Sequence, residues 1–400
     1  MTNATLELGE RYHAASALLA SVRDIVAERA LGDAPPSWCE RRGWTRFLDA
    51  LPDGAVVTAQ RDGLAAHVAE LPGVPADLVT RARAVSAAVS LPAARARDSE
   101  LPEGRRASQR KRVQVAAFGA LLGEFASRPA RIVDVGSGHG HLTRHLARAL
   151  AVPAEGWDHD PARIAVAARL TGGDGPRFVT VDVLHAPSAL AAEDLLVGLH
   201  ACGELGDHAV VAAARAGAAV ALIGCCLQKR AAERLPLTET PLSESLTLAR
   251  SVLGLGNARD GEEGVEADLA SRNRSRVHRV ALRLALADAG LDVRPGEEMR
   301  GLNRRRAMGS LGELIARAFA LRARATPSPH AIAEVERAAY AEYARTSRWE
   351  LPRTLLAPLV ETWVALDRAR YLSTRGYRAE VVVAFPREIS PRNLTVLATR

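Results

Sequence analysis

The chain of 400 residues can form one large domain or two moderate ones, and its 48% apolar content is enough for a buried core. No apolar run is long enough to predict a membrane span, and the first residues lack the basic-then-apolar pattern of a secretion signal. Four cysteines are too few and too unevenly placed for a disulfide framework, which favours a reducing, cytoplasmic compartment.

The sequence carries a formal net charge of +7. An anionic partner would fit that charge, but nearly all the cationic residues are arginines in an alanine-rich chain, as in proteins from high-GC genomes. Only Lys111 and Lys229 are lysines. An ammonium can be deprotonated whereas a guanidinium stays charged, so these two lysines are candidates for a functional role. The alternative is that these two lysines are present by chance and have no functional role.

The first part of the chain predicts helices. Apolar residues recur at helical spacing in residues 12–30 and 75–91, and prolines punctuate the sequence between them. A polar, arginine-rich stretch over residues 94–112 then links to a helix over residues 113–126, directly before the first predicted strand.

The segment Arg131–Leu142, RIVDVGSGHGHL, is the most informative motif. An apolar run that contains Asp134 breaks into Gly136, Gly138 and Gly140, and a helical run follows at once. In an open α/β sheet, a strand followed by a glycine turn and a helix brings backbone N–H groups close to a nucleotide-like ligand. Glycines suit such a turn because a Cβ would hold the main chain away and because the turn visits positive φ. A turn that binds nothing is the alternative.

Two nucleotide cofactors compete for this loop. The dinucleotide fingerprint G-x-G-x-x-G places its third glycine where this sequence has His141. An acid just before the first glycine also suits a cationic ligand better than pyrophosphate. The pattern D-x-G-x-G-x-G resembles motif I of class I S-adenosylmethionine-dependent methyltransferases, which implies that cofactor. An NAD-dependent oxidoreductase is the alternative.

Acids also end the next two predicted strands. Residues 154–158 end in Asp158, and residues 177–182 end in Asp182. A carboxylate at the tip of the second strand can accept both ribose hydroxyls, and Asp182 is placed for the adenine amino group. The alternative for either acid, considered alone, is a loop or helix-cap residue with no ligand. Three acids at three successive strand ends favour a cofactor site, with Asp134 near the methionine moiety.

Two near-continuous apolar runs, residues 194–199 and 219–224, predict parallel strands covered on both faces. Their carboxyl ends should bring together polar and sulfur-containing side chains that are far apart in sequence. These side chains could orient a substrate or cofactor, pack as inert core groups or bind zinc, although their spacing matches no standard zinc module. The residues are His200, Cys202, Cys225, Cys226 and Lys229.

The remaining sequence predicts further helices and a last strand. Residues 230–276 have little apolar periodicity, which indicates a long insertion of the kind that forms lids or binding segments. The arginine-rich runs at residues 271–276 and 303–306 are solvated faces by default. After the insertion we expect a helix over 277–289, a short strand at 291–293, helices over 311–323, 330–347 and 355–373, and a last strand over 377–385.

Several motifs resemble the methyltransferase-like protein 25 family, whose acceptor is poorly defined. They are Leu196–Gly203 (LVGLHACG), Gly224–Cys226 with Lys229, Pro236–Thr238, Ser108–Val115, Leu366–Arg368, Tyr371–Leu372, Ser390–Asn393 and Pro36–Trp38. A looser likeness, in the His-x-Cys-Gly and Cys-Cys segments alone, is to acceptor-stem tRNA 2′-O-methyltransferases. This sequence departs from those enzymes because no His-His pair follows its Cys-Cys pair.

We therefore predict a cytoplasmic methyltransferase with an α/β, Rossmann-like doubly wound sheet that is mostly parallel with one antiparallel strand. A helical N-terminal domain should cover residues 1–100. The methyltransferase domain should cover residues 101–400, with helical insertions at 230–276 and 296–375. RNA or protein is a more suitable acceptor than a small molecule, and a non-catalytic binding protein on the same fold is a further alternative.

The cofactor S-adenosyl-L-methionine should be bound by residues of the first four strand ends: Asp134, Gly136, Ser137, Gly138, Gly140, Asp158, His159, Asp182 and His200. The predicted catalytic residues are His200, Cys202 and Lys229. No metal ligand is predicted.

Overall fold

The computed structural model describes residues 3–94, 108–125, 128–173, 175–185, 189–256 and 265–400. Most of the predicted linker, residues 95–107, and part of the predicted insertion, residues 257–264, lie outside the described residues. The chain forms two compact units, each made of separate segments: unit 1 is Met1–Arg23, Ala84–Asp260 and Leu356–Arg400, and unit 2 is Asp24–Arg83 and Gly261–Leu355. The boundaries between these compact units do not fall at residue 100. The predicted boundary between an N-terminal domain and a methyltransferase domain stays a prediction.

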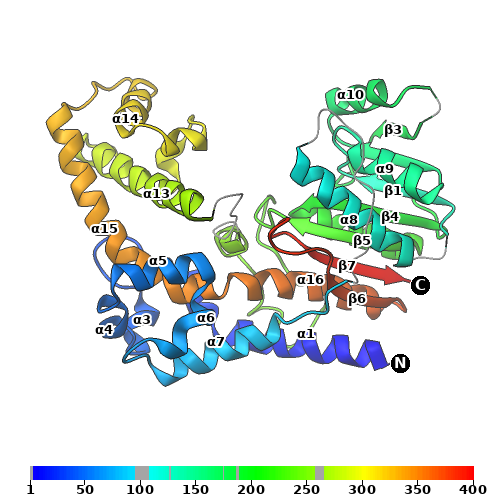
Figure 1. Ribbon diagram of the computed structural model, residues 1–400, viewed down its shortest axis with the longest axis horizontal. Helices are drawn as coiled ribbons and strands as arrows, with labels where there is room; N and C mark the ends of the chain where they lie inside the picture. Colours follow the sequence, from blue (N-terminus) through cyan, green and yellow to red (C-terminus); the bar gives the residue numbers. More distant parts are fainter. Residues whose placement is uncertain (1–2, 95–107, 126–127, 174, 186–188, 257–264) are drawn as a thin grey trace. The chain divides into compact units, whose positions relative to one another are not determined.

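Unit 1 is built on a seven-stranded sheet with the order β3-β2-β1-β4-β5-β7-β6 (Figure 1). Strand β7 runs antiparallel to both of its neighbours, and the other pairs are parallel. The predicted α/β sheet with one antiparallel strand is therefore confirmed. The strands are β1 (Arg131–Val135), β2 (Ala154–Asp158), β3 (Arg177–Thr180), β4 (Asp194–Cys202), β5 (Ala219–Cys225), β6 (Arg378–Val383) and β7 (Leu394–Thr399).

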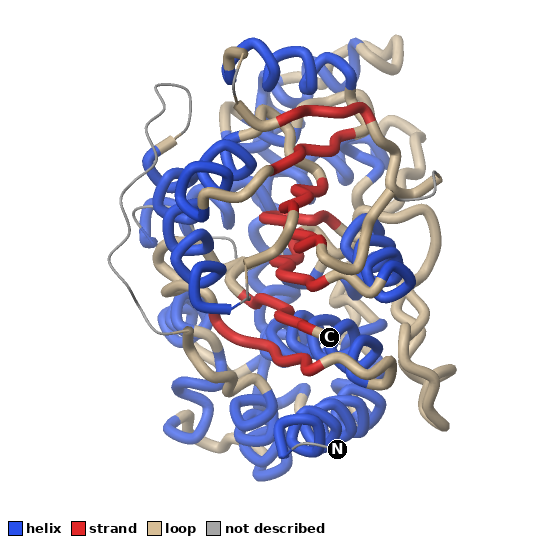
Figure 2. The backbone as a smooth tube through the Cα atoms, turned by 90° about the vertical axis from the view of Figure 1, so that its right-hand side faces the viewer, coloured by secondary structure: helices blue, strands red, loops and turns tan. Residues whose placement is uncertain are grey.

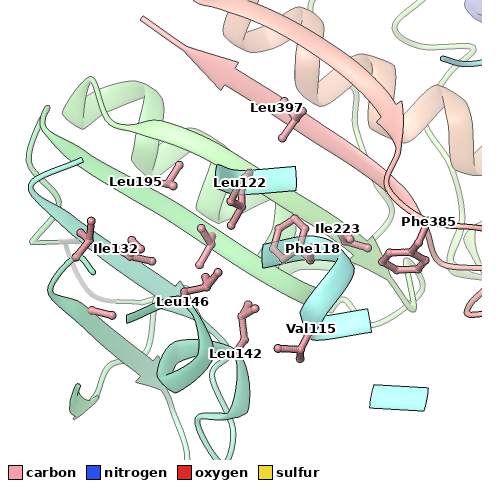
Figure 3. Close-up of a cluster of buried hydrophobic side chains, with 14 of the residues drawn as sticks. Val115, Phe118, Leu122, Ile132, Leu142, Leu146, Leu195, Ile223, Phe385 and Leu397 are labelled. Atoms are coloured by element: carbon pink, nitrogen blue, oxygen red, sulfur yellow. The ribbon is translucent and has the colours of Figure 1, made fainter. Parts of the chain in front are cut away.

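Helices lie along both sides of the strands (Figure 2). On one face, α8 (Gln109–Phe125) and α9 (His141–Leu150) pack their apolar side chains onto β1, β4 and β5. Phe118 of α8 and Leu146 of α9 are fully buried there, in one cluster with Leu195 of β4 and Ile223 of β5 (Figure 3). This packing fixes the direction of the chain as it leaves β1, because α9 begins directly after the glycine loop.

The other helices of unit 1 are α1 (Asn3–Ser21), α10 (Pro161–Thr171), α11 (Glu204–Ala216), α12 (Arg250–Leu253) and α16 (Ala357–Ser373). Helix α11 packs on β4 and β5, and α16 packs on α1, β6 and β7. The helix predicted at 355–373 is present as α16, which packs on the last two strands of the sheet.

The carboxyl ends of the parallel strands meet at one edge, here called the carboxyl edge. The strand order reverses at β1, which pairs with β2 on one side and with β4 on the other. Ligands of open α/β sheets bind outside the carboxyl ends at such a reversal. The fold therefore brings the glycine loop after β1 next to the end of β4.

One strand prediction was wrong, and one strand was not located. Residues 291–293 form no strand, because Leu291 and Val293 pack against the core of unit 2, after Gly290 ends the preceding helix with φ 76°. Strand β7 was not predicted. Its partner β6 directly precedes it in the chain, whereas its other partner, β5, is far from it in sequence. It also supplies the antiparallel strand, which had been expected without being located.

Unit 2 is helical. Its hydrophobic core joins α13 and α14 to α15, and α15 also packs on α4, α5 and α6. Residues 271–276, predicted as a solvated face, lie in α13, where Asn273 bonds Gln60 and Tyr343. Its helices are α2 (Arg23–Ala27), α3 (Ser37–Arg41), α4 (Thr45–Asp49), α5 (Asp53–Asp62), α6 (Leu64–His67), η1 (Val68–Glu70), α13 (Val265–Asp288), η3 (Glu297–Met299), η4 (Arg304–Met308), α14 (Leu311–Ala320) and α15 (Pro329–Leu355). Helix α7 (Ala76–Ala88) spans the boundary of the two units.

Among the described residues, no helix is both long enough and apolar enough to cross a membrane.

Candidate functional site

The glycine loop has the backbone conformation that its sequence predicts. Gly136, Gly138 and Gly140 all have positive φ, at 70°, 56° and 72°. Residues other than glycine adopt this region at a cost of roughly 1–2 kcal/mol each. A Cβ on Gly140 would also lie 2.4 Å from the ring of Phe178, whereas a Cβ on Gly138 would have no atom of the described residues within 4 Å. Gly140 therefore serves close packing, and no described residue crowds Gly138.

The amide groups of this loop are directed differently from expectation. The N–H groups of Gly136 and Ser137 both donate to the Trp157 carbonyl of β2, at 2.8 and 3.0 Å, and Gly140 N–H donates to Ser137 O. Gly138 N–H donates to Asp158 Oδ2 at 2.9 Å. These amides hold the loop against β2, so the glycines shape the loop more than they present donors to a ligand.

One polar atom of the loop lacks a partner. Ser137 is 8% exposed, and its buried Oγ forms no hydrogen bond with any residue that the structure describes. A buried hydroxyl without a partner costs about 1–3 kcal/mol, so such an atom marks a place where a ligand group would be stabilising.

Asp134 lies beneath the loop and is 2% exposed. Thr143 of α9 donates its hydroxyl to Asp134 Oδ2 at 2.6 Å. Burial raises the pKa of the Asp134 carboxyl to about 7, although the bond from Thr143 and the positive charge of Lys111 act in the opposite direction. Close to neutral pH, small changes in the surrounding charge therefore decide whether this carboxyl is ionised.

Asp158 stands at the tip of β2 with a side chain that is 3% exposed. Besides Gly138 N–H, its carboxylate accepts the N–H of Asp160 at 3.0 Å. The neighbouring His159 is mostly exposed, and its Nδ1 lies 3.4 Å from Asp158 Oδ1. Asp160 caps α10 by accepting from Ala162 N–H at 2.9 Å, as its position before a proline predicts.

Asp182 follows β3 and is far more exposed. It accepts from Leu184 N–H at 3.0 Å and from His185 Nδ1 at 2.9 Å, both in its own turn. The bond from His185 lowers the pKa of this carboxyl below its usual range. The contacts of Asp182 are thus local, unlike those of Asp158, which join two strand ends.

His200 occupies an irregular position at the end of β4. The register between β4 and β5 shifts between Leu199 and Ala201, and His200 has φ 71°. Its Nε2 donates to Gln114 Oε1 of α8 at 2.8 Å. Burial and then the positive charge of Lys111 lower the pKa of His200 to about 4, so the imidazole is neutral at physiological pH.

Sulfur atoms gather beside it. The Sγ atoms of Cys202 and Cys225 are 2.9 Å apart, and Cys226 completes a group in which all three sulfur atoms lie within 4.8 Å of one another. Lys229 Nζ is 3.9 Å from Cys202 Sγ. Hydrogen bonds from Cys202 and then Cys225 hold the pKa of the Cys226 thiol below its usual range. The predicted convergence of these side chains at the ends of β4 and β5 is present in the structure.

A buried ion network supports this end of the sheet. Asp207 of α11 accepts from Arg234 at 3.0 Å and from Arg368 of α16 at 2.8 Å. Arg234 also donates to Asp367 at 2.8 Å, and Arg368 donates to Gly203 O at 3.1 Å. Burial opposes ionisation of Asp207, but the two guanidinium groups outweigh it and hold the pKa of its carboxyl well below the usual range. The start of the predicted insertion is therefore anchored to α11 and α16.

Two contacts of the site were not predicted. Gln114 bonds His200, and Thr143 bonds Asp134. Gln114 is 4% exposed on a helix face that is otherwise apolar, and a buried glutamine in such a pattern is the signal that could have identified it. Thr143 is a threonine in the first turn of α9, where no residue type marks its bond to the preceding strand.

Residues 110–233 match the model of a family described as a methyltransferase domain. The matched range contains β1 to β5 and every residue of the predicted site. This stretch of the chain is therefore a methyltransferase domain, and the strand order of its sheet agrees with the predicted class I methyltransferase fold.

Solved structures similar to the chain include three methyltransferases. A TehB-like S-adenosylmethionine-dependent methyltransferase from Corynebacterium glutamicum has 22% identity, covers 26% of this chain and 60% of its own, and gives a TM-score of 0.23. A sugar N-methyltransferase from Streptoalloteichus has 20% identity, and the match covers 34% of this chain and 59% of its own, with a TM-score of 0.25. The magnesium protoporphyrin IX methyltransferase from Synechocystis with bound S-adenosylhomocysteine has 22% identity, and the match covers 30% of this chain and 61% of its own, with a TM-score of 0.24. The chain thus spans about 60% of the length of these structures.

Proposed function

We propose that the protein is an S-adenosylmethionine-dependent methyltransferase whose cofactor binds at the glycine loop. The observation that carries this proposal is the junction of Gly138 and Asp158 in a methyltransferase domain. A buried carboxylate at the tip of β2 lies there against a glycine whose Cβ position no described residue approaches within 4 Å. The unpartnered Ser137 hydroxyl lies in the same loop. These features suit a ligand with hydroxyl groups and a positive charge.

Each residue of the site has a proposed part in binding. Asp158 accepts the ribose hydroxyls, and Asp182 and His159 lie toward the adenine. Asp134 sits beneath the methionine moiety, and Gly136, Gly138 and Gly140 shape the loop around it. S-adenosylmethionine supplies the electrophilic methyl group when bound. The chain's own contribution is to hold donor and acceptor in line, which supplies much of the rate when the acceptor is already electron-rich.

The β4 and β5 ends are the proposed acceptor side. His200 is neutral and tied to Gln114, so its imidazole is fixed in one orientation. Cys202 and Lys229 lie in contact with each other at the adjacent strand end. We assign His200, Cys202 and Lys229 to the positioning of the acceptor, with His200 also bordering the cofactor.

For the acceptor we propose RNA, with protein as the second candidate. A hollow of about 710 Å³ lies at the amino ends of β2 and β3, and it is lined in part by Arg144, Arg148 and Arg177. Guanidinium groups bind phosphate oxygens in a bidentate manner, so this hollow, at the edge of the sheet opposite the carboxyl edge, fits part of the phosphate backbone of an RNA acceptor.

Within the methyltransferases we place the chain nearest to the methyltransferase-like protein 25 family. One motif that supports this placement, Leu366–Arg368, has a structural role in this protein, because Asp367 and Arg368 belong to the buried ion network. We also propose a cytoplasmic location, which four free cysteines favour.

The test is methylation of a cell extract with isotopically labelled S-adenosylmethionine, followed by separation of RNA, protein and small molecules. We expect label in the RNA fraction, with protein label supporting the second candidate. Lys229→Arg should reduce turnover on the labelled fraction while cofactor affinity is nearly unchanged, because a guanidinium is bulkier and cannot lose its proton. Full turnover in Lys229→Arg would remove this lysine from the acceptor side. No labelled product with the wild type, despite cofactor binding, would support a non-catalytic binding protein.

A further inference from the structure

The three cysteines at the ends of β4 and β5 form a cluster that the methyltransferase proposal does not use in full. We propose that Cys202, Cys225 and Cys226 together bind one zinc ion through their thiolates. Their sulfur atoms lie within 4.8 Å of one another, although 22 residues separate Cys202 from Cys225 in the sequence. Sequence spacing predicted no such site, because the ligands come from two neighbouring strands.

The backbone is arranged to bring these sulfur atoms together. Side chains of consecutive strand residues point to opposite faces, so an extended chain would separate the thiols of Cys225 and Cys226. Cys226 has φ 40° instead, which ends the alternation. In the same way, the irregularity at His200 shifts the register so that Cys202 pairs with Cys225. Only four described residues other than glycine have positive φ, and two of them, His200 and Cys226, adjoin this cluster.

The free-energy cost of positive φ at His200 and Cys226 indicates that these conformations serve a function. Left-handed backbone in a residue other than glycine costs of the order of 1–3 kcal/mol and persists where the surrounding structure enforces it, commonly at ligand-binding sites. Inert packing of small sulfur side chains would not require strained backbone at two neighbouring strand ends. Binding of a metal by the three thiolates would offset that cost.

The geometry suits a tetrahedral thiolate site. Zinc–sulfur bonds of about 2.3 Å place neighbouring sulfur atoms about 3.8 Å apart. That separation lies between the 2.9 Å of Cys202 and Cys225 and the 4.8 Å that bounds the cluster, so small side-chain rotations suffice. Cys202 and Cys226 are half-buried, which leaves a path for an ion to enter. Three protein ligands leave a fourth position open for water or another ligand.

The charge nearby suits the same assignment. Three thiolates around Zn²⁺ carry one net negative charge, and the Lys229 ammonium, 3.9 Å from Cys202 Sγ, balances it. Lys229 is one of only two lysines in a chain whose other cationic residues are arginines. A compact ammonium fits beside a sulfur atom more readily than a planar guanidinium. The metal site does not depend on the chain being an active methyltransferase.

Zinc content of the full-length protein tests the proposal. The protein is purified with a reducing agent, exposed to zinc, freed of loosely bound metal and measured by mass spectrometry, and we expect about one zinc ion per chain. Cobalt in place of zinc should give the sulfur-to-cobalt charge-transfer band and the visible bands of tetrahedral coordination. The cobalt spectrum of the wild type identifies thiolate ligands even if a cysteine variant does not fold.

Variants make the test specific. Cys202→Ala and Cys226→Ala should each lower zinc affinity by at least about tenfold, because loss of a ligand weakens a zinc site strongly. Cys39→Ala is the matched control, since Cys39 is a buried free cysteine of unit 2, and this variant should keep the metal. Absence of zinc and of the cobalt spectrum in the reduced wild type would overturn the proposal. A disulfide between Cys202 and Cys225 that forms in air, with no metal uptake after reduction, would overturn it in favour of a redox pair.

Discussion

The carboxyl edge of the sheet is built differently on the two sides of β1. On the acid side, formed by β1 to β3 and the glycine loop, carboxylates such as Asp158 are held by backbone N–H groups. On the sulfur side, formed by the ends of β4 and β5, three thiols and Lys229 lie together, His200 and Cys226 have positive φ, and a buried ion network supports this end of the sheet. The acid side needs glycines to take its shape, whereas the sulfur side needs charges from α11, α16 and the segment after β5. We infer that the first side holds the cofactor and the second holds the acceptor and a metal.

The largest expected effect is on the sulfur side. Asp367 is fully buried and accepts hydrogen bonds from Arg234, Leu237 N–H and Thr238 N–H. Asp367→Ala leaves the Arg234 charge buried and less compensated, so the free energy of unfolding should fall by about 3–5 kcal/mol. Denaturant unfolding measures this loss. Glu7→Ala, which removes an exposed ion pair with Arg11, is the control and should cost less than about 0.5 kcal/mol. Comparable losses in the two variants would mean that the network does not support the sulfur side.

The next effect separates two glycines of the acid side. Gly140→Ala combines positive φ with a contact of 2.4 Å to Phe178, and we expect a loss of about 2–4 kcal/mol in the free energy of unfolding. Gly138→Ala should cost only the backbone strain, about 1–2 kcal/mol, because no described residue lies within 4 Å of its Cβ position. Denaturant unfolding of both variants measures the difference. If Gly138→Ala were as harmful as Gly140→Ala, close packing against β3 would not explain the third glycine.

A pH-dependent effect follows from Asp134. The pKa of its carboxyl is raised to about 7 by burial, so between its ordinary value and that pH the folded state keeps a proton that the unfolded state has lost. The stability of the fold should therefore fall as the pH rises through this range, and change no further above it. From pH 5 to pH 7.5 we expect the wild type to lose roughly 2–3 kcal/mol relative to Asp134→Asn, which has no titrating group there. Unfolding free energies of both proteins at the two pH values decide the matter, and parallel pH profiles would show that Asp134 is ionised in the fold.

The sequence predicts most of what local patterns determine. Continuous apolar runs located β4 and β5, and the D-x-G-x-G-x-G pattern located the positive-φ loop, because each signal lies within a dozen residues. The same patterns do not show long-range pairing. Strand β7 was missed because its place in the sheet depends on pairing with β5, which is far away in the chain, although its other partner β6 directly precedes it. The apolar residues at 291 and 293 pack into a helical core instead of a sheet.

The site shows the same limit at the level of single side chains. Acids at strand ends could be predicted, but the bonds from Gly138 to Asp158 and from Gln114 to His200 depend on how separate elements pack. The cysteine cluster likewise depends on a register shift and on a left-handed residue that no composition rule indicates. Functional residues at the end of a single strand can be predicted from the sequence. Contacts between residues of different elements cannot.

Calorimetric titration of the wild type with S-adenosylhomocysteine and with NAD tests the central claim, that the acid side binds the methyltransferase cofactor. We expect binding of S-adenosylhomocysteine and none of NAD, and Asp158→Ala should weaken that binding by roughly 1.5–3 kcal/mol through loss of charge-assisted hydrogen bonds. Asp160→Ala, which removes only the cap of α10, should leave it nearly unchanged. Binding of NAD in place of S-adenosylhomocysteine, or equal affinity in Asp158→Ala and the wild type, would contradict the account.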